Sequence, residues 1–448
     1  MKKIYYKNES EKGFNNFKIS GQTVSLDLFY SVAIVKKASA IANNKIGRLN
    51  DKIFQAIKKS IDRILNKEFD DQFIIDQIQG GAGTSINMNV NEVISSIAEE
   101  ILNDGTKVHP NDDVNMGQST NDVIPTAIKL IAIKKFDELI LVCKNIATTL
   151  RKKEKDFSNI IKVGRTHLQD AVPMTLGQTF GAYASFIERN ITRFEETKKY
   201  LLSTNLGGTA IGSGINSSKS YIKIANEELA KISGYNFFPA KDLFDLTQNS
   251  DDFAHFASVL KTFAMGLSKI STDIRMLASG PRAGISEIFL PELQKGSSIM
   301  PGKVNPVVLE MMNQICYQVY GNAETCFNAC ENSQFELNVM LPIYAKNILE
   351  ALTILTNGIK TLDEKVISGI APNLNKIKSN FENSLCLATA LNRYIGYDKA
   401  SELVKRAERN GTNLIDELRN ENLINEEKLK KILNPKNLTE PQDEFEKI

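Results

Sequence analysis

Residues 253 to 277 read FAHFASVLKTFAMGLSKISTDIRML, and this stretch decides the fold class. Its large apolar residues recur every three or four positions, at Phe253, Phe256, Leu260, Phe263, Leu267, Ile270, Ile274 and Leu277. Steps of three and four place these side chains on one face of an α-helix. A helix of this length cannot bury such a face alone, so it must pack on other helices, within the chain or across subunits.

Two further stretches carry the same helical spacing. One runs through Ile128, Ile131, Phe136, Leu139, Ile140, Cys143, Ile146 and Leu150, and the other through Phe180, Tyr183, Ile187, Ile191, Phe194 and Leu201. Strand signals are weak and limited to short apolar runs near Ile74 and Ile288, without an alternation of strands and helices. We therefore expect a mainly α protein. A mixed, mostly helical N-terminal domain (1–117) would precede a long central helix bundle (118–373) and a small helical C-terminal domain (374–448).

The charge balance argues against two classes of partner. The chain has 55 Lys and Arg residues and 53 Asp and Glu residues, which gives a net charge of +2. So small an excess leaves no electrostatic footprint for nucleic acid or for an anionic membrane. No stretch approaches the roughly 20 apolar residues that a membrane span needs. We expect neither a nucleic-acid partner nor a membrane association.

Cysteine usage points to a reducing compartment. The five cysteines are odd in number and lack the paired spacing of a metal site; they are Cys143, Cys316, Cys326, Cys330 and Cys386. Reduced thiols are typical of cytoplasmic proteins. The start, MKKIYYKNES, has two lysines but no apolar segment behind them, so we expect no secretory signal and a cytoplasmic location.

Five polar islands interrupt the apolar background. They span residues 80–85, 109–122, 164–170, 207–214 and 296–306. The last reads GSSIMPGKVNP, and its two glycines and two prolines exclude a regular helix or a central strand. The first island lacks the Gly-Lys-Ser/Thr ending of a nucleotide-binding loop. The sequence predicts that the islands are loops and that they hold a ligand other than a nucleotide.

The side chains in these islands are mostly neutral hydrogen-bond donors with one cation. They are Thr84, Ser119, Thr120, Asn121, Thr166, Lys303 and Asn305. Ser119 and Asn121 also suit plain helix N-caps, although a helix N-terminus is itself an anion site. Of the three histidines, His167 has polar neighbours on both sides, whereas His255 lies beside an apolar stripe and is interpreted as structural. The set suits a small dicarboxylic acid and the dianionic enediolate formed from it, and it contains no metal or cofactor site.

The loop at 296–306 resembles the signature of the aspartase/fumarase superfamily, and the other islands match that family's blocks in order. The resemblance covers nearly the whole chain. It implies a mainly helical, three-domain subunit with a long central helix bundle. It also implies a homotetramer whose active sites are shared between three subunits. The implied chemistry is anti elimination from a small dicarboxylate to give fumarate, without a cofactor.

The family's roles carry over to matching positions. Ser297 would be the general base that takes the Cβ proton, its anion stabilised by loop N–H groups and Lys303. Carboxylates would be bound by Lys303 and Asn305 together with Thr84, Ser119, Thr120, Asn121 and Thr166. His167, coupled to Glu310, would contact a carboxylate or assist proton transfer. His109, Asn111 and Asp112 match a block that forms a secondary anion site in fumarases.

The leaving group is harder to read from the sequence. Blocks that resemble aspartases are residues 80–85, 170–174, 290–294, 307–308 with 313–314, and 432–435. Blocks that resemble fumarases are residues 112–114, 207–210, 335–338 and 395–399. Because the first set lies nearer the loops expected to hold substrate, the sequence favours release of ammonia from L-aspartate over release of water from L-malate.

Two features of the sequence bear on whether the chain is active. The family's N-terminal Tyr-Gly-x-Gln-Thr element is replaced here by residues 5–10, YYKNES, which puts a changed or reduced activity in view. A catalytically idle helical scaffold is the alternative from another class. Such a scaffold would be expected to have lost Ser297, Lys303 or His167, and all three are present.

Overall fold

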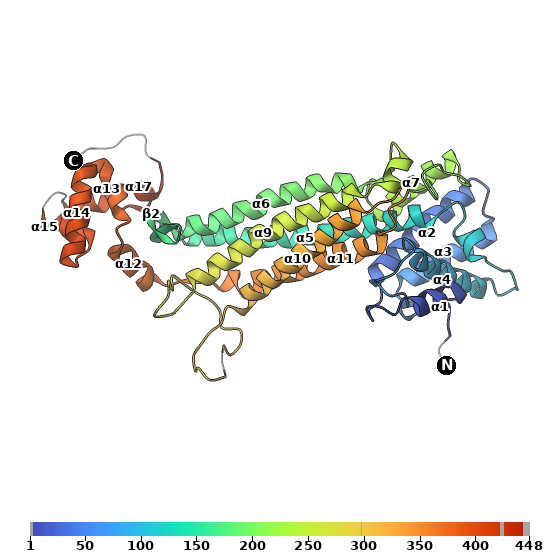
Figure 1. Cartoon of the computed structure of the whole chain (residues 1–448), viewed down its shortest axis with the longest axis horizontal. Helices are drawn as coiled ribbons and strands as arrows, with labels where there is room; N and C mark the ends of the chain where they lie inside the picture. Colours follow the sequence, from blue (N-terminus) through green and yellow to red (C-terminus); the bar gives the residue numbers. More distant parts are fainter. Residues whose placement is uncertain (1–2, 297, 422–424, 442–448) are drawn as a thin grey trace. The chain divides into compact units, whose positions relative to one another are not determined.

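The computed structural model describes residues 3–296, 298–421 and 425–441, so Ser297 lies outside the described residues. The chain is mainly helical, which confirms the expected fold class (Figure 1). It divides into two compact units. Unit 1 comprises residues 1–140, 192–265 and 315–356, and unit 2 comprises residues 141–191, 266–314 and 357–448. The domain boundaries at 117 and 373 stay predictions.

Five long helices pass through these units and carry about half of the buried apolar residues among those described. They are α5 (Thr120–Asp156), α6 (Leu176–Leu201), α9 (Asp251–Leu277), α10 (Val307–Glu331) and α11 (Leu341–Lys365). The apolar stripe quoted for residues 253–277 is buried along its whole length, which confirms the helical prediction. In unit 1 the ring of Phe136 packs against Phe194 and Phe256, with centroids 4.9 and 4.7 Å apart. These rings join α5, α6 and α9, and each buried phenylalanine contributes about 1.5–3 kcal/mol.

Unit 1 also contains shorter elements in its first two segments, 1–140 and 192–265. They are α1 (Asn8–Asn16), α2 (Leu26–Lys45), α3 (Asp51–Leu65), η1 (Asp70–Gln72), α4 (Thr84–Leu102), η2 (Pro110–Val114), β3 (Ser203–Thr204), α7 (Lys219–Ser233), β4 (Phe238–Pro239) and α8 (Leu243–Gln248). Helix α2 packs against α3 and α7, and α3 packs against α4. β3 and β4 form a two-residue parallel pair.

The atypical N-terminal segment is held by one buried carboxylate. Glu92 of α4 accepts hydrogen bonds from the backbone N–H groups of Lys7, Glu9 and Ser10, at 2.8, 2.9 and 3.1 Å. The hydroxyl of Ser10 donates to the same carboxylate. These contacts satisfy N–H groups at the start of α1 that have no partner inside the helix. The segment that departs from the family pattern is therefore ordered against α4.

Unit 2 contains two small sheets and a helical C-terminal region. The first sheet is the hairpin of β1 (Ile161–Thr166) and β2 (Gln169–Thr175), and the second pairs β5 (Ile288–Phe289) with β6 (Ala371–Pro372). η3 (Ile367–Gly369) precedes β6. The C-terminal helices are α12 (Leu374–Asn383), α13 (Leu387–Ile395), α14 (Tyr397–Asn410), α15 (Leu414–Asn420), α16 (Glu426–Ile432) and α17 (Pro435–Thr439). They share a buried leucine-rich cluster that includes Leu391, Leu403 and Leu418.

The strand expectations meet mixed results. The apolar run near Ile288 does form a strand, whereas near Ile74 the structure has an isolated bridge between Thr23 and Asp76. The polar island at 164–170 was expected to be a loop, and this is wrong, because most of it belongs to the hairpin. A bulge between Val163 and Arg165 shifts the strand register there, and this breaks the alternation that would have indicated a strand.

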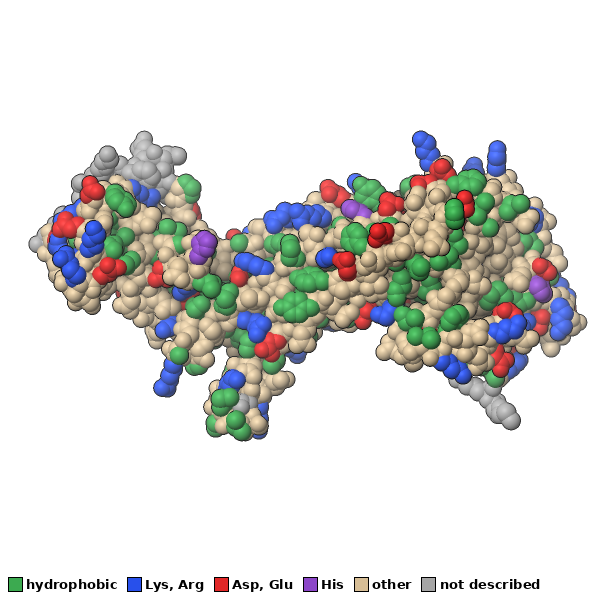
Figure 2. All heavy atoms as spheres, viewed as in Figure 1, with side chains coloured by type: hydrophobic (Ala, Val, Ile, Leu, Met, Phe, Trp, Pro, Cys, Tyr) green, Lys and Arg blue, Asp and Glu red, His purple; other side chains and the backbone are tan. Residues whose placement is uncertain are grey.

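The surface agrees with the balanced composition. On the face shown in Figure 2, basic and acidic side chains are interspersed along the helices. Within the described part of the chain, no helix combines the length and the apolar character needed to cross a membrane.

Candidate active site

The start of α5 carries three of the expected binding residues in unit 1. Ser119 is the N-cap of this helix: its hydroxyl accepts from the N–H of Asn121 at 3.2 Å. In return, the N–H of Ser119 donates to the carboxylate of Asp122 at 2.9 Å. The capping interpretation is thus confirmed for Ser119 but not for Asn121, which lies inside α5. Since a helix N-terminus presents unpaired N–H groups and a partial positive charge, the same place favours an anion.

Asp122 ties this helix start to the island at 207–214. Its second carboxylate oxygen accepts from the N–H groups of Gly207 and Thr209, each at 3.0 Å. The side chain is fully buried, and burial raises the pKa of Asp122 to about 6 although the three N–H donors act in the opposite direction. One carboxylate therefore fixes two islands that are 85 or more residues apart in the sequence.

Lys36 of α2 is the buried cation that accompanies Asp122. It is fully buried, and burial lowers its pKa to about 7 against the attraction of Asp122. Its ammonium donates to Oδ1 of Asn115 at 2.5 Å, and Asn87 donates to the same oxygen at 3.2 Å. Asn87 also donates to the hydroxyl of Thr120 at 3.3 Å. The network thereby joins the N-terminal end of α4 to that of α5.

Pro125 leaves the backbone carbonyl of Asn121 available to a neighbouring segment. Proline has no N–H, so the carbonyl of Asn121 lacks its usual partner one turn ahead in α5. The amide of Asn205 donates to that carbonyl at 3.0 Å. The side chain of Asn121 in turn donates to the carbonyl of Ala210 at 2.7 Å. One accepted and one donated hydrogen bond with the segment at 205–210 therefore hold Asn121 at the helix start.

Thr84 begins α4 at the end of an irregular turn. The preceding residues Gly81, Ala82 and Gly83 all have positive φ, at 80°, 55° and 88°. The hydroxyl and the N–H of Thr84 both bond the carbonyl of Gly81, at 2.7 and 2.9 Å. The island at 80–85 is thus a tight turn that opens a helix, with the exposed Thr84 at its N-terminus.

His109 acts as a cap in the structure. Its Nδ1 accepts from the N–H groups of Asn111 and Asp112, at 3.3 and 3.0 Å, at the start of η2. The N–H of His109 donates to Asp113 at 2.7 Å. The three residues of the expected secondary anion site therefore lie together, and their anion-binding role stays a prediction.

Unit 2 presents Thr166 and His167 at the tip of the hairpin. Thr166 pairs with Gln169, so His167 and Leu168 form a two-residue turn, with φ of 54° and 63°. Such turns favour Asn-Gly or Asp-Gly, because both central residues need positive φ. A residue with a larger side chain in this region costs of order 1–3 kcal/mol. The exposed tip is therefore strained at the histidine expected to act in catalysis.

The island at 296–306 is closed at its base. The side-chain amide of Asn305 donates to the carbonyl of Gly296 at 2.6 Å. The backbone at Lys303 passes so close to Gly296 that a Cβ on Gly296 would lie 1.9 Å from the carbonyl oxygen of Lys303. Lys303 is exposed on this loop. The expected base, Ser297, lies outside the described residues.

Glu310 lies in the first turn of α10. Arg275 of α9 approaches its carboxylate at 3.4 Å and donates to Oδ1 of Asn313 at 3.1 Å. Asn313 donates in turn to Ser268. Arg275 thus holds the end of α9 against the start of α10. The expected coupling of Glu310 to His167 stays a prediction.

The candidate residues fall into two sets. Unit 1 holds Thr84, His109, Asn111, Asp112, Ser119, Thr120 and Asn121, and unit 2 holds Thr166, His167, Lys303, Asn305 and Glu310. Sequence reasoning missed three groups that fix these residues, namely Lys36, Asp122 and Arg275. The described residues contain no cluster of three or more His, Cys, Asp or Glu side chains suited to a metal ion.

Family models match most of the chain. One described as "Lyase" matches residues 2–321, and one described as "Fumarase C C-terminus" matches residues 387–440. An aspartate ammonia-lyase of Bacillus sp is 44% identical over 444 residues, which cover 98% of this chain and 95% of that protein. A class II fumarate hydratase of Rickettsia bellii is 43% identical over 443 residues, covering 97% and 95%.

Solved structures agree with this assignment. A fumarate lyase:delta crystallin of Brucella melitensis, bound to cobalt, superposes with a TM-score of 0.94 at 40% identity, covering 98% of this chain and 96% of that one. A class II fumarase of Schistosoma mansoni gives a TM-score of 0.91 at 34% identity, covering 96% and 95%. The chain therefore belongs to the aspartase/fumarase superfamily and is a lyase.

Proposed function

We propose that this lyase eliminates ammonia reversibly from L-aspartate to give fumarate. The observation that carries the proposal is the donor set: the helix N-termini at Thr84 and Ser119 in unit 1, and Lys303 and Asn305 on a loop closed at its base in unit 2. These groups suit a substrate with two carboxylates. The aspartate ammonia-lyases at 40–44% identity over 98% of this chain support ammonia as the leaving group.

The proposed reaction begins at the carbon next to the distal carboxylate. Ser297, as its anion, removes a proton from Cβ, and the electron pair of that C–H bond passes into the carboxylate to give a dianionic enediolate. Neutral donors and Lys303 stabilise this charge; one such donor can contribute about 2.7–4 kcal/mol in the transition state. The electron pair then returns to form the C=C bond as the C–N bond breaks. Ammonia leaves and fumarate remains.

We also propose a homotetramer with shared active sites. In the single chain Thr84, Thr166, His167 and Lys303 are all exposed. Elimination through an enediolate needs a site from which bulk water is excluded, because water weakens every electrostatic contact to the developing charge. Coverage by other copies of the chain meets this need, and cross-linking or light scattering would test it.

The substrate assignment predicts a simple assay result. Purified protein given L-aspartate should form fumarate, measured by its ultraviolet absorbance, whereas L-malate should give none. Fumarate hydratase is the second candidate, which the Rickettsia bellii relative at 43% identity favours. Fumarate from malate alone would overturn the proposal, and no fumarate from either substrate would favour the idle scaffold.

The closed loop predicts a large effect of one methyl group. In Gly296→Ala the new Cβ would lie 1.9 Å from the Lys303 oxygen and 3.1 Å from the Asn305 nitrogen, so the backbone carrying both residues must shift. We expect kcat/KM for L-aspartate to fall roughly a hundredfold, as displacements of about 1 Å can do. The melting temperature should change little, because much of the loop is exposed.

Gly302→Ala is the matched control for that variant. Gly302 lies in the same loop with φ of 76° and open space around the position of a Cβ, so alanine adds backbone strain without a clash. Its loss of kcat/KM should be much smaller. Equal losses in the two variants would show that the close approach at Gly296 is not what shapes the loop.

A further inference from the structure

The strained tip at His167 and Leu168 needs support from its surroundings. Two adjacent residues with positive φ persist in a turn only where the rest of the structure determines their conformation. The strand below the tip cannot provide this alone, because the bulge between Val163 and Arg165 interrupts its register. Side chains at the base of the hairpin must therefore contribute.

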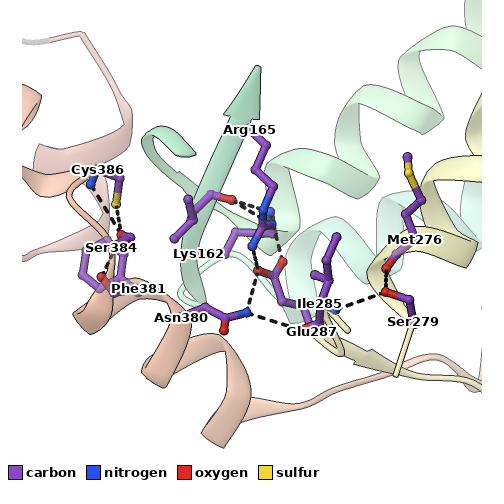
Figure 3. A network of polar contacts seen from close by, with 11 residues as sticks. Lys162, Arg165, Met276, Ser279, Ile285, Glu287, Asn380, Phe381, Ser384 and Cys386 are labelled. Atoms are coloured by element: carbon purple, nitrogen blue, oxygen red, sulfur yellow. Dashed lines mark hydrogen bonds and ion pairs between the residues drawn. The ribbon is translucent and has the colours of Figure 1, made fainter. Parts of the chain in front are cut away.

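Glu287 is the group that binds the base of the hairpin. Its fully buried carboxylate is joined by Arg165 at 2.7 Å and by Lys162 at 3.2 Å, so both cations of β1 converge on it (Figure 3). Arg165 directly precedes Thr166 and His167 in the sequence. Lys162 is also buried, and burial lowers its pKa while the carboxylate acts in the opposite direction.

Glu287 is itself fixed from three sides. Its N–H donates to the carbonyl of Leu277 at the end of α9, at 2.8 Å, and its carbonyl accepts from the N–H of Asn373 at 2.9 Å. The amide of Asn380 in α12 donates to the carboxylate at 3.3 Å. The backbone of Glu287 is thus fixed at both its N–H and its carbonyl, and Asn380 adds a contact to the carboxylate oxygen that Arg165 binds. Figure 3 shows Arg165 of β1 and Asn380 of α12 reaching Glu287 from two different elements.

We propose that Glu287 is a positioning residue for the reaction: through Arg165 and Lys162 it holds the strained hairpin tip that presents Thr166 and His167. This rests on the proposed function, because those two residues act on substrate there. Glu287 touches no reacting atom. Its effect is to keep His167 and Leu168 in the positive-φ turn, which they would otherwise not maintain.

The first test is Glu287→Gln, which keeps the shape and removes the charge. We expect kcat/KM for L-aspartate to fall roughly tenfold to a hundredfold. Hydrogen–deuterium exchange of the amides in residues 161–175 should become faster, while exchange in the middle of α6 stays as in the wild type. Glu188→Gln is the control, because Glu188 of α6 pairs with Arg151 in the same unit at 2.6 Å.

A double variant separates positioning from stability. Glu287→Gln leaves Lys162 as an uncompensated buried cation, which lowers the melting temperature. Adding Lys162→Met removes that cation, so the melting temperature should recover while kcat/KM stays low, since Arg165 still lacks its carboxylate. Recovery of activity together with stability would overturn the proposal, as would a wild-type kcat/KM in Glu287→Gln.

A rescue variant tests the strain directly. Asparagine adopts positive φ more readily than leucine and lacks the flexibility of glycine. Adding Leu168→Asn to Glu287→Gln should therefore raise kcat/KM several-fold above that of Glu287→Gln alone. Hydrogen–deuterium exchange of the hairpin amides should also become slower again. An unchanged activity and exchange would count against the strained tip. Wild-type protein assayed in parallel tests the reaction itself, and the exchange measurement tests Glu287 whichever substrate is used.

Discussion

Replacing Ser297 by alanine is expected to lower kcat for L-aspartate by roughly a thousandfold, which is within the range that a general base contributes. The hydroxyl is needed only where the Cβ proton moves, so KM should change little. The neutral donors and Lys303 that we propose bind the carboxylates remain in this variant. Steady-state kinetics by fumarate absorbance, with calorimetric titration of substrate, measure the two quantities separately.

Ser298→Ala is the matched control, because it removes the neighbouring hydroxyl of the same loop. Its kcat should stay within about tenfold of the wild type if Ser297 alone is the base. Turnover near the wild-type level in Ser297→Ala contradicts the assignment. Equal losses in the two variants would indicate that the loop needs both hydroxyls for its shape.

Asp122→Ala should have the largest effect on stability. The change leaves three backbone N–H groups without their acceptor, on Ser119, Gly207 and Thr209. It also leaves the buried Lys36 without the carboxylate that attracts it. A buried donor left without its acceptor costs about 1–3 kcal/mol. We expect the first thermal transition to fall by roughly 10 °C and activity to fall with it, because Asn121 and Thr120 lose their support.

Calorimetry of Asp122→Ala beside Asp104→Ala checks this prediction. Asp104 is a half-exposed carboxylate in the same unit that pairs with Lys52 at the surface. Surface ion pairs add little to stability, so its removal should barely change the melting temperature. If Asp122→Ala has the same melting temperature as Asp104→Ala, the buried network around Asp122 does not stabilise the fold as expected.

The long helices could be predicted because their signal is local. Phe256, Leu260 and Phe263 recur at the helical period, and any partner that buries one buries the others. The hairpin could not be predicted in the same way. Its turn is His167-Leu168, which is not among the preferred turn pairs, and the bulge beside Arg165 breaks the strand period.

The supporting charges were missed for a different reason. Lys36 and Lys37 are adjacent and chemically identical, yet Lys36 is fully buried. Lys37 is only partly buried and pairs with the more exposed Asp62 at 2.5 Å. Only the packing of α2 against its neighbours distinguishes them. Glu287 likewise ends the stretch ASGPRAGISE (278–287), which reads as a loop, and it looks like a surface charge in the sequence. Burial of an ion is a property of tertiary structure, so such residues emerge only from the fold.

The hydrogen bond from Asn305 to Gly296 has a consequence for recognition. A side-chain amide has two Nδ2 protons, and one of them is occupied inside the loop. The second proton consequently points in a direction set before any ligand arrives. A carboxylate that approaches Asn305 meets a donor whose rotation is already restricted, and it need not supply the entropy of fixing that side chain. In the proposed reaction, Asn305 would therefore distinguish ligands by their geometry more than by their charge.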